Sequence, residues 1–387
     1  MFKYHNGTKL FTISIFLLAA LFLLPVASMA GDNATHVGGY GELHYNKPMK
    51  GVDKSKSAGK LDFHRFVLFF GHQFNNWVSF HSELEVEHTY VEGGEKTGEV
   101  ALEQAYVELQ YSPKFALRAG VLLVPVGIIN PYHEPPTFNG VERPNVEKYI
   151  IPSTWRESGI GATGKLNEKF SYEAYLMAGL NPEGITGKDG IRGARQKAYN
   201  ASTDDYAFTA RLNYQHNLNL STGASFFTSS LSRDAKYGNA LEGARLTMGE
   251  IHAIANFGNF QARALAVVSS INEAAKLNQL FSATDADNPM IGDGQFGAYG
   301  ELAYDFLGHI LPETEQRLFA FARYETYNTH NSTDGFDANP EYERKETTLG
   351  LTYLPTTRVA LKADIQLLKT AGEKDVTQFN MGVGYNF

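Results

Sequence analysis

The chain has 387 residues, of which 43% are hydrophobic and 20% charged, and its formal net charge is −8. This negative charge argues against nucleic acid as a partner. Because the chain contains no cysteine, a fold held together by disulfide bonds is excluded.

The first thirty residues have the pattern of a secretory signal peptide. Two lysines precede an apolar run over residues 10–26, and the small-residue sequence Ser-Met-Ala follows it. We therefore predict cleavage between Ala30 and Gly31, which assigns residues 1–30 to a signal peptide and residues 31–387 to the mature domain. An uncleaved membrane anchor is the alternative, which the short apolar run and its small-residue exit disfavour.

The mature sequence repeats segments of about ten residues in which apolar and polar positions alternate, the pattern of membrane barrel strands. In "WVSFHSELEVEHTY", for example, Leu84 and Val86 lie on one face and Glu83, Glu85 and Glu87 on the other. No apolar run after the signal peptide is long enough for a transmembrane helix. We predict sixteen strands, an even number as in single-chain bacterial barrels. The predicted strands cover residues 37–46, 60–74, 77–91, 99–111, 115–124, 156–166, 169–180, 205–215, 218–229, 243–257, 260–271, 295–306, 316–328, 344–354, 358–370 and 376–387.

The predicted connections alternate in length along the chain. Those after even-numbered strands are mostly short, and those after odd-numbered strands are mostly long. Outer-membrane barrels have short turns at one end and longer loops at the other, whereas a soluble sandwich has no reason to sort its connections in this way. The sequence therefore predicts an all-β fold, a transmembrane 16-stranded antiparallel β-barrel. The long connections cover residues 47–59, 125–155, 181–204, 230–242, 272–294 and 329–343.

The third long connection lies within "LVPVGIINPYHEPPTFNGVERPNVEKYIIPSTW", residues 123–155. Its six prolines exclude a strand or a long helix, while its many Ile, Val, Tyr and Phe residues argue against disorder. A 16-stranded barrel encloses an aqueous channel. We therefore predict that residues 125–155, approximately, fold inward, pack apolar side chains on the wall and narrow the channel.

The sequence ends on "TQFNMGVGYNF", in which apolar and polar residues again alternate. This pattern, with an aromatic residue at its end, resembles the terminal strand of outer-membrane barrels. We predict that Tyr385 and Phe387 form the signal read by the barrel assembly machinery. A terminal strand of a soluble sandwich is the alternative.

Four stretches together resemble the phosphate-selective porin O and P family: "LDFHRFVLFFGHQFNNWVSFHSELEVEH", "LEQAYVEL", "LRAGVLLVPVGIINPYHEPPTFNGVERP" and "IIPSTWRESGIGATG". The resemblance covers chiefly residues 61–166. It implies a 16-stranded outer-membrane porin of a Gram-negative bacterium, typically trimeric, that passes small solutes by diffusion. Phosphate selectivity in that family depends on an arginine ladder and a lysine cluster in the channel.

Strand alternation predicts which charged side chains line the channel wall. The set mixes both signs and is somewhat acidic, so it indicates weak selectivity rather than a dedicated phosphate pathway. A phosphate- or polyphosphate-selective porin remains the alternative. The predicted wall residues are Arg65, Glu83, Glu85, Glu87, Glu108, Arg118, Arg211, Glu301, Arg323, Glu325, Lys362 and Asp364.

Two groups of these charges have two interpretations each. Glu83, Glu85 and Glu87 either attract cations as a strip or form ion pairs with Arg65 and neighbouring bases; their spacing along a strand is too wide for one shared Ca²⁺. The predicted constriction residues either narrow the channel or, as we favour for Glu134 and Arg143, hold the loop to the wall. The predicted constriction residues are Glu134, Glu142, Arg143, Glu147 and Lys148.

The sequence favours passive diffusion of small hydrophilic solutes and ions over two functions of other classes. A barrel hydrolase is disfavoured because HExxH, GxSxG and P-loop motifs are absent, and a structural sleeve for another envelope protein would need a wider barrel. We expect no enzyme activity, cofactor or metal. Membrane lipid and lipopolysaccharide are the expected partners. A basic cluster near Arg192 in the fourth long connection either gathers anions, contacts lipopolysaccharide phosphates or is simply solvated; it consists of Lys188, Arg192, Arg195 and Lys197.

Overall fold

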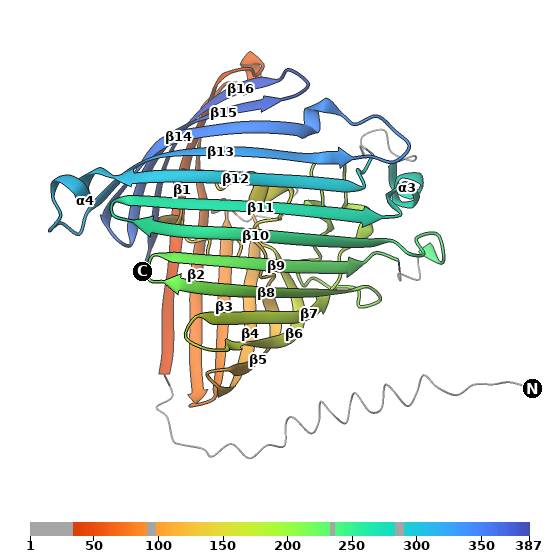
Figure 1. Cartoon of the computed structure of the whole chain (residues 1–387), viewed down its shortest axis with the longest axis horizontal. Helices are drawn as coiled ribbons and strands as arrows, with labels where there is room; N and C mark the ends of the chain where they lie inside the picture. The colour runs from red at the N-terminus through yellow and green to blue at the C-terminus, as the bar shows by residue number, and fades with distance from the viewer. Residues whose placement is uncertain (1–33, 91–97, 233–236, 283–289) are drawn as a thin grey trace, which may run out of the picture.

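The protein, described here by a computed structural model, is a barrel of sixteen strands (Figure 1). The structure describes residues 34–90, 98–232, 237–282 and 290–387, so the predicted signal peptide lies outside the described residues. The strands are β1 (Ala34–Lys50), β2 (Lys60–Asn75), β3 (Val78–Glu87), β4 (Val100–Ser112), β5 (Phe115–Leu123), β6 (Arg156–Lys165), β7 (Phe170–Ala178), β8 (Tyr206–Asn217), β9 (Leu220–Ser230), β10 (Arg245–Phe257), β11 (Phe260–Asn272), β12 (Gly294–Asp305), β13 (Arg317–Ser332), β14 (Glu343–Thr356), β15 (Val359–Thr370) and β16 (Asp375–Asn386).

Each strand pairs antiparallel with its neighbours in the chain, and β1 pairs with β16 to close the barrel. At this seam Tyr40 faces Asn386 and Lys47 faces Phe379. The seam continues to Phe387, whose backbone N–H donates to the Gly39 carbonyl at 2.9 Å and whose carbonyl accepts from Gly39 N–H at 3.1 Å. The predicted 16-stranded antiparallel barrel is therefore confirmed.

The two ends of the barrel differ as the connection lengths predicted. In Figure 1 the tight β10–β11 turn and helix α4 lie at one end, and helix α3 and the longer connections lie at the other. We call these the turn end and the loop end. The described helices are η1 (Lys54–Lys56), η2 (Pro135–Thr137), α2 (Val146–Tyr149), η3 (Pro182–Gly184), η4 (Arg192–Ala194), α3 (Ala274–Leu277), η6 (Asn278–Ser282), α4 (Phe306–Ile310) and η7 (Pro340–Tyr342). None of them is long and apolar enough to cross a membrane.

On many strands, exposed apolar residues alternate with buried residues that are often polar. On β8, Phe208 and Leu212 are exposed, whereas Thr209 and Arg211 between them are buried. On β14 and β15, Leu349 and Ile365 are likewise exposed beside the buried polar residues Thr348 and Asp364. A continuous apolar outer face on a closed barrel is the surface that lipid covers.

The connection between β5 and β6, residues 124–155, supplies much of the hydrophobic core, and we call it the connecting segment. Val124, Val126, Ile150, Ile151 and Trp155 are completely buried. They belong to one cluster with apolar side chains of strands β7 to β13. The ring of Trp155, for example, lies 4.4 Å from that of Phe227 on β9. The apolar composition of this segment is thus explained by packing against the barrel wall.

Candidate functional site

The two ends of the connecting segment are joined by one buried side chain, Asn130. Its amide nitrogen donates to the carbonyls of Val124 at 2.7 Å and Trp155 at 3.1 Å, and its amide oxygen accepts from Trp155 N–H at 2.7 Å. Val124 N–H also donates to the Trp155 carbonyl at 2.9 Å. These bonds satisfy backbone groups that would otherwise be buried without partners. They also hold the first and last residues of the segment next to each other, at the point where it leaves and rejoins the wall.

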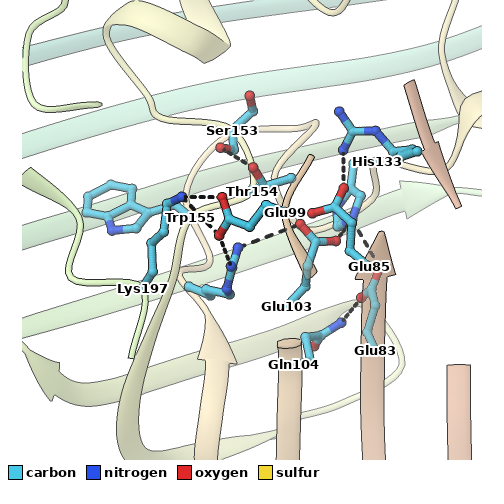
Figure 2. Close-up of polar contacts among 12 residues, drawn as sticks. Glu83, Glu85, Glu99, Glu103, Gln104, His133, Ser153, Thr154, Trp155 and Lys197 are labelled. Atoms are coloured by element: carbon cyan, nitrogen blue, oxygen red, sulfur yellow. Dashed lines mark hydrogen bonds and ion pairs between the residues drawn. The ribbon is translucent and has the colours of Figure 1, made fainter. Parts of the chain in front are cut away.

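His133 of the connecting segment lies in a buried ionic cluster with Glu83 of β3 and Glu103 of β4 (Figure 2). Its Nε2 is 3.3 Å from Glu83 Oε1 and 3.2 Å from Glu103 Oε2, and its Nδ1 is 3.0 Å from the Asn130 carbonyl. Burial lowers the pKa of His133, but the bonds to the two carboxylates outweigh burial and raise that pKa to about 10. His133 is therefore a buried cation that ties the segment to two strands.

Glu142 makes a second attachment, to β1. Its Oε1 accepts from Asn46 Nδ2 at 2.8 Å and lies 3.3 Å from His44 Nδ1. Burial raises the pKa of Glu142, but the bonds to His44 and Asn46 dominate and lower it to about 2. Glu142 is therefore ionised under ordinary conditions and serves as a strut, while its predicted part in the constriction stays a prediction.

Glu147 is fully buried, so its carboxylate is held within the protein rather than presented to a channel. Its oxygens accept from Tyr299 Oη and from Ile129 N–H, both at 2.7 Å. Burial raises the pKa of Glu147 to about 7, against the opposing effect of these bonds. The sequence predicts Glu147 at the constriction because a charged residue usually faces water.

Further bonds join the connecting segment to acidic residues of β12 to β15. Val141 N–H donates to Asp364 Oδ2 at 2.7 Å, and Val146 N–H donates to Glu325 Oε2 at 3.0 Å. Counting every attachment, the segment bonds to strands β1, β3, β4, β8, β11, β12, β13, β14 and β15. Two of the predicted wall carboxylates, Asp364 and Glu325, therefore accept hydrogen bonds from the backbone of the segment.

Most of the other predicted wall charges are paired with one another or with the segment. Their partners explain how the wall tolerates buried charge. The ion pairs are Arg65 with Glu42 (2.7 Å) and Glu85 (3.1 Å), Arg118 with Glu108 (2.6 Å), and Arg323 with Glu325 (2.9 Å) and Glu301 (3.5 Å). Arg211 forms hydrogen bonds with His252 (3.0 Å) and with the Gly127 carbonyl. The ammonium group of Lys362 lies 3.7 Å from the centre of the Phe138 ring.

The predicted acidic strip on β3 does not act as a unit. Glu83 bonds to His133 and Gln104, and Glu85 pairs with Arg65. Glu87 is only half-buried and borders a cavity. The ion-pair interpretation therefore describes Glu83 and Glu85, and Glu87 alone remains available to attract cations.

That cavity, of about 240 Å³, lies between β1–β3 and the connecting segment, and we call it the mixed-charge cavity. Acidic and basic groups face it from both sides. Its charged lining consists of Glu42, Arg65, Glu87, Glu142, Arg143, Lys148 and Arg192. Arg143 also donates to the His133 carbonyl at 3.2 Å, so it is both lining and strut. Glu134 instead precedes η2 and makes no capping bond with its side chain.

Two more cavities adjoin the connecting segment. One, of about 690 Å³, opens toward the turn end, since Pro113 and Lys165 line it together with Pro131 and Tyr132 of the segment. The other, of about 440 Å³, is bordered by bases and by Asp189. Its basic lining consists of Lys148, Arg192, Arg195 and Lys197.

Part of this basic group has a structural role. Arg195 donates to the carbonyls of Ser153 and Arg192, both at 2.8 Å. Burial, with the nearby Arg192, lowers the pKa of Arg195 to about 10. Lys197 lies 3.2 Å from Glu99. The basic cluster near Arg192 is therefore partly built into the loop end rather than simply solvated.

Strand alternation cannot place two residues, His64 and Glu103, because each lies in a β-bulge. Opposite β1, Glu42 pairs with Arg65 and Leu43 with Phe63, so His64 is an extra residue. Opposite β3, Glu83 pairs with Gln104 and Leu84 with Leu102, so Glu103 is extra as well. A β-bulge of this kind changes the face on which later residues lie, and nothing in the sequence marks either bulge.

No family model matches the chain. An uncharacterized protein of Aquifex aeolicus (strain VF5) is 37% identical over 360 residues, which cover 91% of this chain and 79% of that protein. The chain belongs to the family of that protein. The resemblance to the phosphate-selective porin O and P family stays a prediction.

Solved structures of outer-membrane channels share the fold of this family member. OmpF of Salmonella typhi aligns over 93% of this chain and all of its own, with a TM-score of 0.60 and 14% identity. The channel DcaP of Acinetobacter baumannii aligns over 94% of this chain and all of its own, with a TM-score of 0.57 and 13% identity. An anion-selective porin from Comamonas acidovorans aligns over 92% of this chain and all of its own, with a TM-score of 0.55 and 13% identity.

Proposed function

We propose that the protein is an outer-membrane porin, a water-filled channel for passive diffusion of small hydrophilic solutes and ions. The observation that carries the proposal is the closed 16-stranded barrel whose connecting segment bonds to strands all around it and leaves charged cavities beside it. A barrel of this size has an interior wider than its side chains fill. A segment held across that interior narrows it without closing it.

The mixed-charge cavity is the proposed constriction. Glu87 and Arg65 face it from the barrel wall, and Arg143 and Lys148 face it from the connecting segment. Charges of both signs around a narrow passage produce a transverse field and only weak preference for one ion sign. Polar solutes that can align in such a field are the substrate class we propose.

An anion-selective pathway, for phosphate or polyphosphate, is the second candidate. It is supported by the bases around the 440 Å³ cavity at the loop end, especially Lys148 and Arg192. Against it, the predicted wall arginines Arg65 and Arg323 are each paired with carboxylates. A sleeve for another protein would need an open interior, which the many bonds of the connecting segment oppose.

The proposed location is the outer membrane of a Gram-negative bacterium. The apolar outer faces of the strands support contact with lipid. From the family resemblance we also propose a homotrimer. The N-terminal pattern supports export by a cleaved signal peptide, the C-terminal pattern supports assembly by the barrel machinery, and the bases near Arg192 support contact with lipopolysaccharide.

Single-channel recording in a planar bilayer under a salt gradient tests the function. We expect steady conductance with a reversal potential near zero. Lys148→Gln should shift the reversal potential toward cation preference and Glu87→Gln toward anion preference, because each removes one charge from the mixed-charge cavity. Lys114→Gln, at the exposed turn end, is the control and should leave the reversal potential unchanged.

Three results would change the proposal. A folded protein that conducts no current contradicts a porin. Strong anion preference, with current blocked by added phosphate, supports the second candidate instead. If Lys148→Gln and Lys114→Gln shift the reversal potential equally, the mixed-charge cavity does not lie on the ion path.

A further inference from the structure

Three side chains at the loop end, Asp62, His64 and His88, bring two imidazole nitrogens and a carboxylate to one point. Asp62 Oδ2 lies 3.2 Å from His64 Nδ1 and 2.8 Å from His88 Nδ1. One ligand atom from each residue lies within 4.8 Å of the other two. Imidazole nitrogen with carboxylate oxygen is a donor set that divalent transition metals favour.

The fold builds this group from a bulge and a strained turn. The bulge in β2 makes His64 the extra residue opposite β1, and the His64 ring stacks on that of His44 at 4.6 Å. His88 follows β3 with a φ of +57°, a conformation rare for residues with a side chain. Its N–H donates to the His64 carbonyl at 3.1 Å. Such strain persists only where surrounding contacts hold it and is frequent at functional sites.

The group is open to solvent. The side chains of Asp62, His64 and His88 are 32%, 27% and 49% exposed, and both histidines border the mixed-charge cavity. Within the part of the chain that the structure describes, the ion pairs of Asp62 are with these two histidines. A cation entering from solvent can therefore reach the carboxylate without displacing a lysine or arginine.

Among the described residues, one other group has metal-ligand spacing, formed by Glu83, Glu103 and His133, and it differs in exposure and in its ion pairs. All three residues are buried. Glu103 already lies 3.8 Å from Arg156, and His133 supplies a positive charge of its own. That group is an internal ion cluster, and it provides a matched comparison for the open one.

The distances within the open group suit a small ion. Ligand atoms bound tetrahedrally at 2.0–2.2 Å lie roughly 3.4 Å apart. Asp62 Oδ2 lies 3.2 Å from His64 Nδ1, near that value, and 2.8 Å from His88 Nδ1, so a small outward shift of the half-exposed His88 ring admits the ion. We propose that Asp62, His64 and His88 bind one divalent transition-metal ion of the Zn²⁺ class through Oδ2 and the two Nδ1 atoms. A fourth position is left for water. This site goes beyond the proposed channel function, and the sequence alone predicted no metal.

The test uses untagged full-length protein, purified in detergent, stripped with a chelator and dialysed against Zn²⁺. Elemental analysis should find one zinc per chain. His64→Ala and His88→Ala should lose it, and His88→Ala should also lose the visible spectrum of tetrahedral Co²⁺. Since His88 is half exposed and follows a strand, its replacement leaves the barrel folded, which heat-dependent gel migration checks.

Two matched variants should keep the zinc. His72→Ala removes another histidine of β2, whose ring bonds to Thr35, and His133→Gln removes the histidine of the buried group. The proposal is overturned if the wild-type protein holds no zinc, if His88→Ala keeps the wild-type amount, or if His72→Ala loses it as well. His133→Gln counts in the same way only for the fraction that gel migration shows to be folded.

Discussion

His133 shows how a single residue can hold a long segment to the wall of a barrel. Its imidazolium lies between Glu83 and Glu103, and its other nitrogen bonds to the Asn130 carbonyl. Each carboxylate comes from a different strand, so one charge ties three parts of the chain together. Removing one partner of a buried ion pair leaves the other charges without compensation, which typically costs about 3–5 kcal/mol.

The raised pKa of His133 makes the protein less stable at high pH. The folded protein keeps a proton that the unfolded chain releases above pH 6.5, so the stabilisation is full below pH 6.5 and is lost as pH rises to about 10. Glu147, with its pKa raised from 4.5 to about 7, lowers the stability of the folded protein between pH 4.5 and pH 7, mostly below the range in which His133 acts. We expect the free energy of unfolding, measured by denaturant titration, to fall between pH 6.5 and pH 10.

His133→Gln provides the comparison for this pH dependence. It should lower the free energy of unfolding at pH 6.5 and flatten the fall toward pH 10, because the titrating group is gone. An unchanged fall in the variant would show that other groups cause it. At the acid end, loss of stability should follow protonation of Glu142, whose pKa is about 2.

At the scale of elements, the connecting segment depends on acceptors that the far wall supplies. Asp364 of β15 accepts from the backbone of Val141 and from Asn380. Removing it leaves the Val141 N–H without this acceptor, a loss of about 1–3 kcal/mol. The segment is anchored at many points, so the expected effect is local loosening rather than unfolding.

Asp364→Ala should therefore change conduction more than stability. We expect larger and noisier single-channel currents, because part of the segment detaches from β15 and the passage widens. Asp375→Ala is the control, since Asp375 is paired with Lys50 at the exposed end of β16. Identical current traces for the two variants would contradict a role for this attachment in setting the passage.

The strands were predictable from sequence, and the site was predictable only in part. Strand alternation reports burial residue by residue, so all sixteen strands and the outward position of residues such as Phe208 and Leu212 follow from it. The bulges at His64 and Glu103 do not, because one extra residue leaves the local composition unchanged. The partners of Glu147 and His133 depend on distant strands, which no local pattern reveals.

At the scale of the whole molecule, the seam between β1 and β16 completes the barrel. Phe387 extends this seam through its two backbone bonds to Gly39, and its ring stacks with those of Tyr385 and Phe66 at 6.4 and 6.3 Å. The sequence predicts a role in assembly for Tyr385 and Phe387, and these contacts give a physical reason for it. Loss of the ring should impair closure of the barrel more than it affects the finished wall.

We expect Phe387→Ala to lower the amount of folded protein in the outer-membrane fraction, measured by heat-dependent gel migration. Phe257→Ala is a close control, because Phe257 is an aromatic residue near a strand end with the same exposed fraction of 51%. Equal yields of the two variants would show that any exposed aromatic residue has this effect, and that Phe387 has no special part in assembly.

The seam also sets the order in which the protein can be made. Asn46 of β1 and Asn380 of β16 share a hydrogen bond across 334 positions of sequence. Until β16 has been synthesised, β1 keeps one edge without a partner, and such an edge is prone to pair with other chains. Pairing of distant segments is also slow. The cell must therefore keep the emerging chain from folding or aggregating until all sixteen strands are available together.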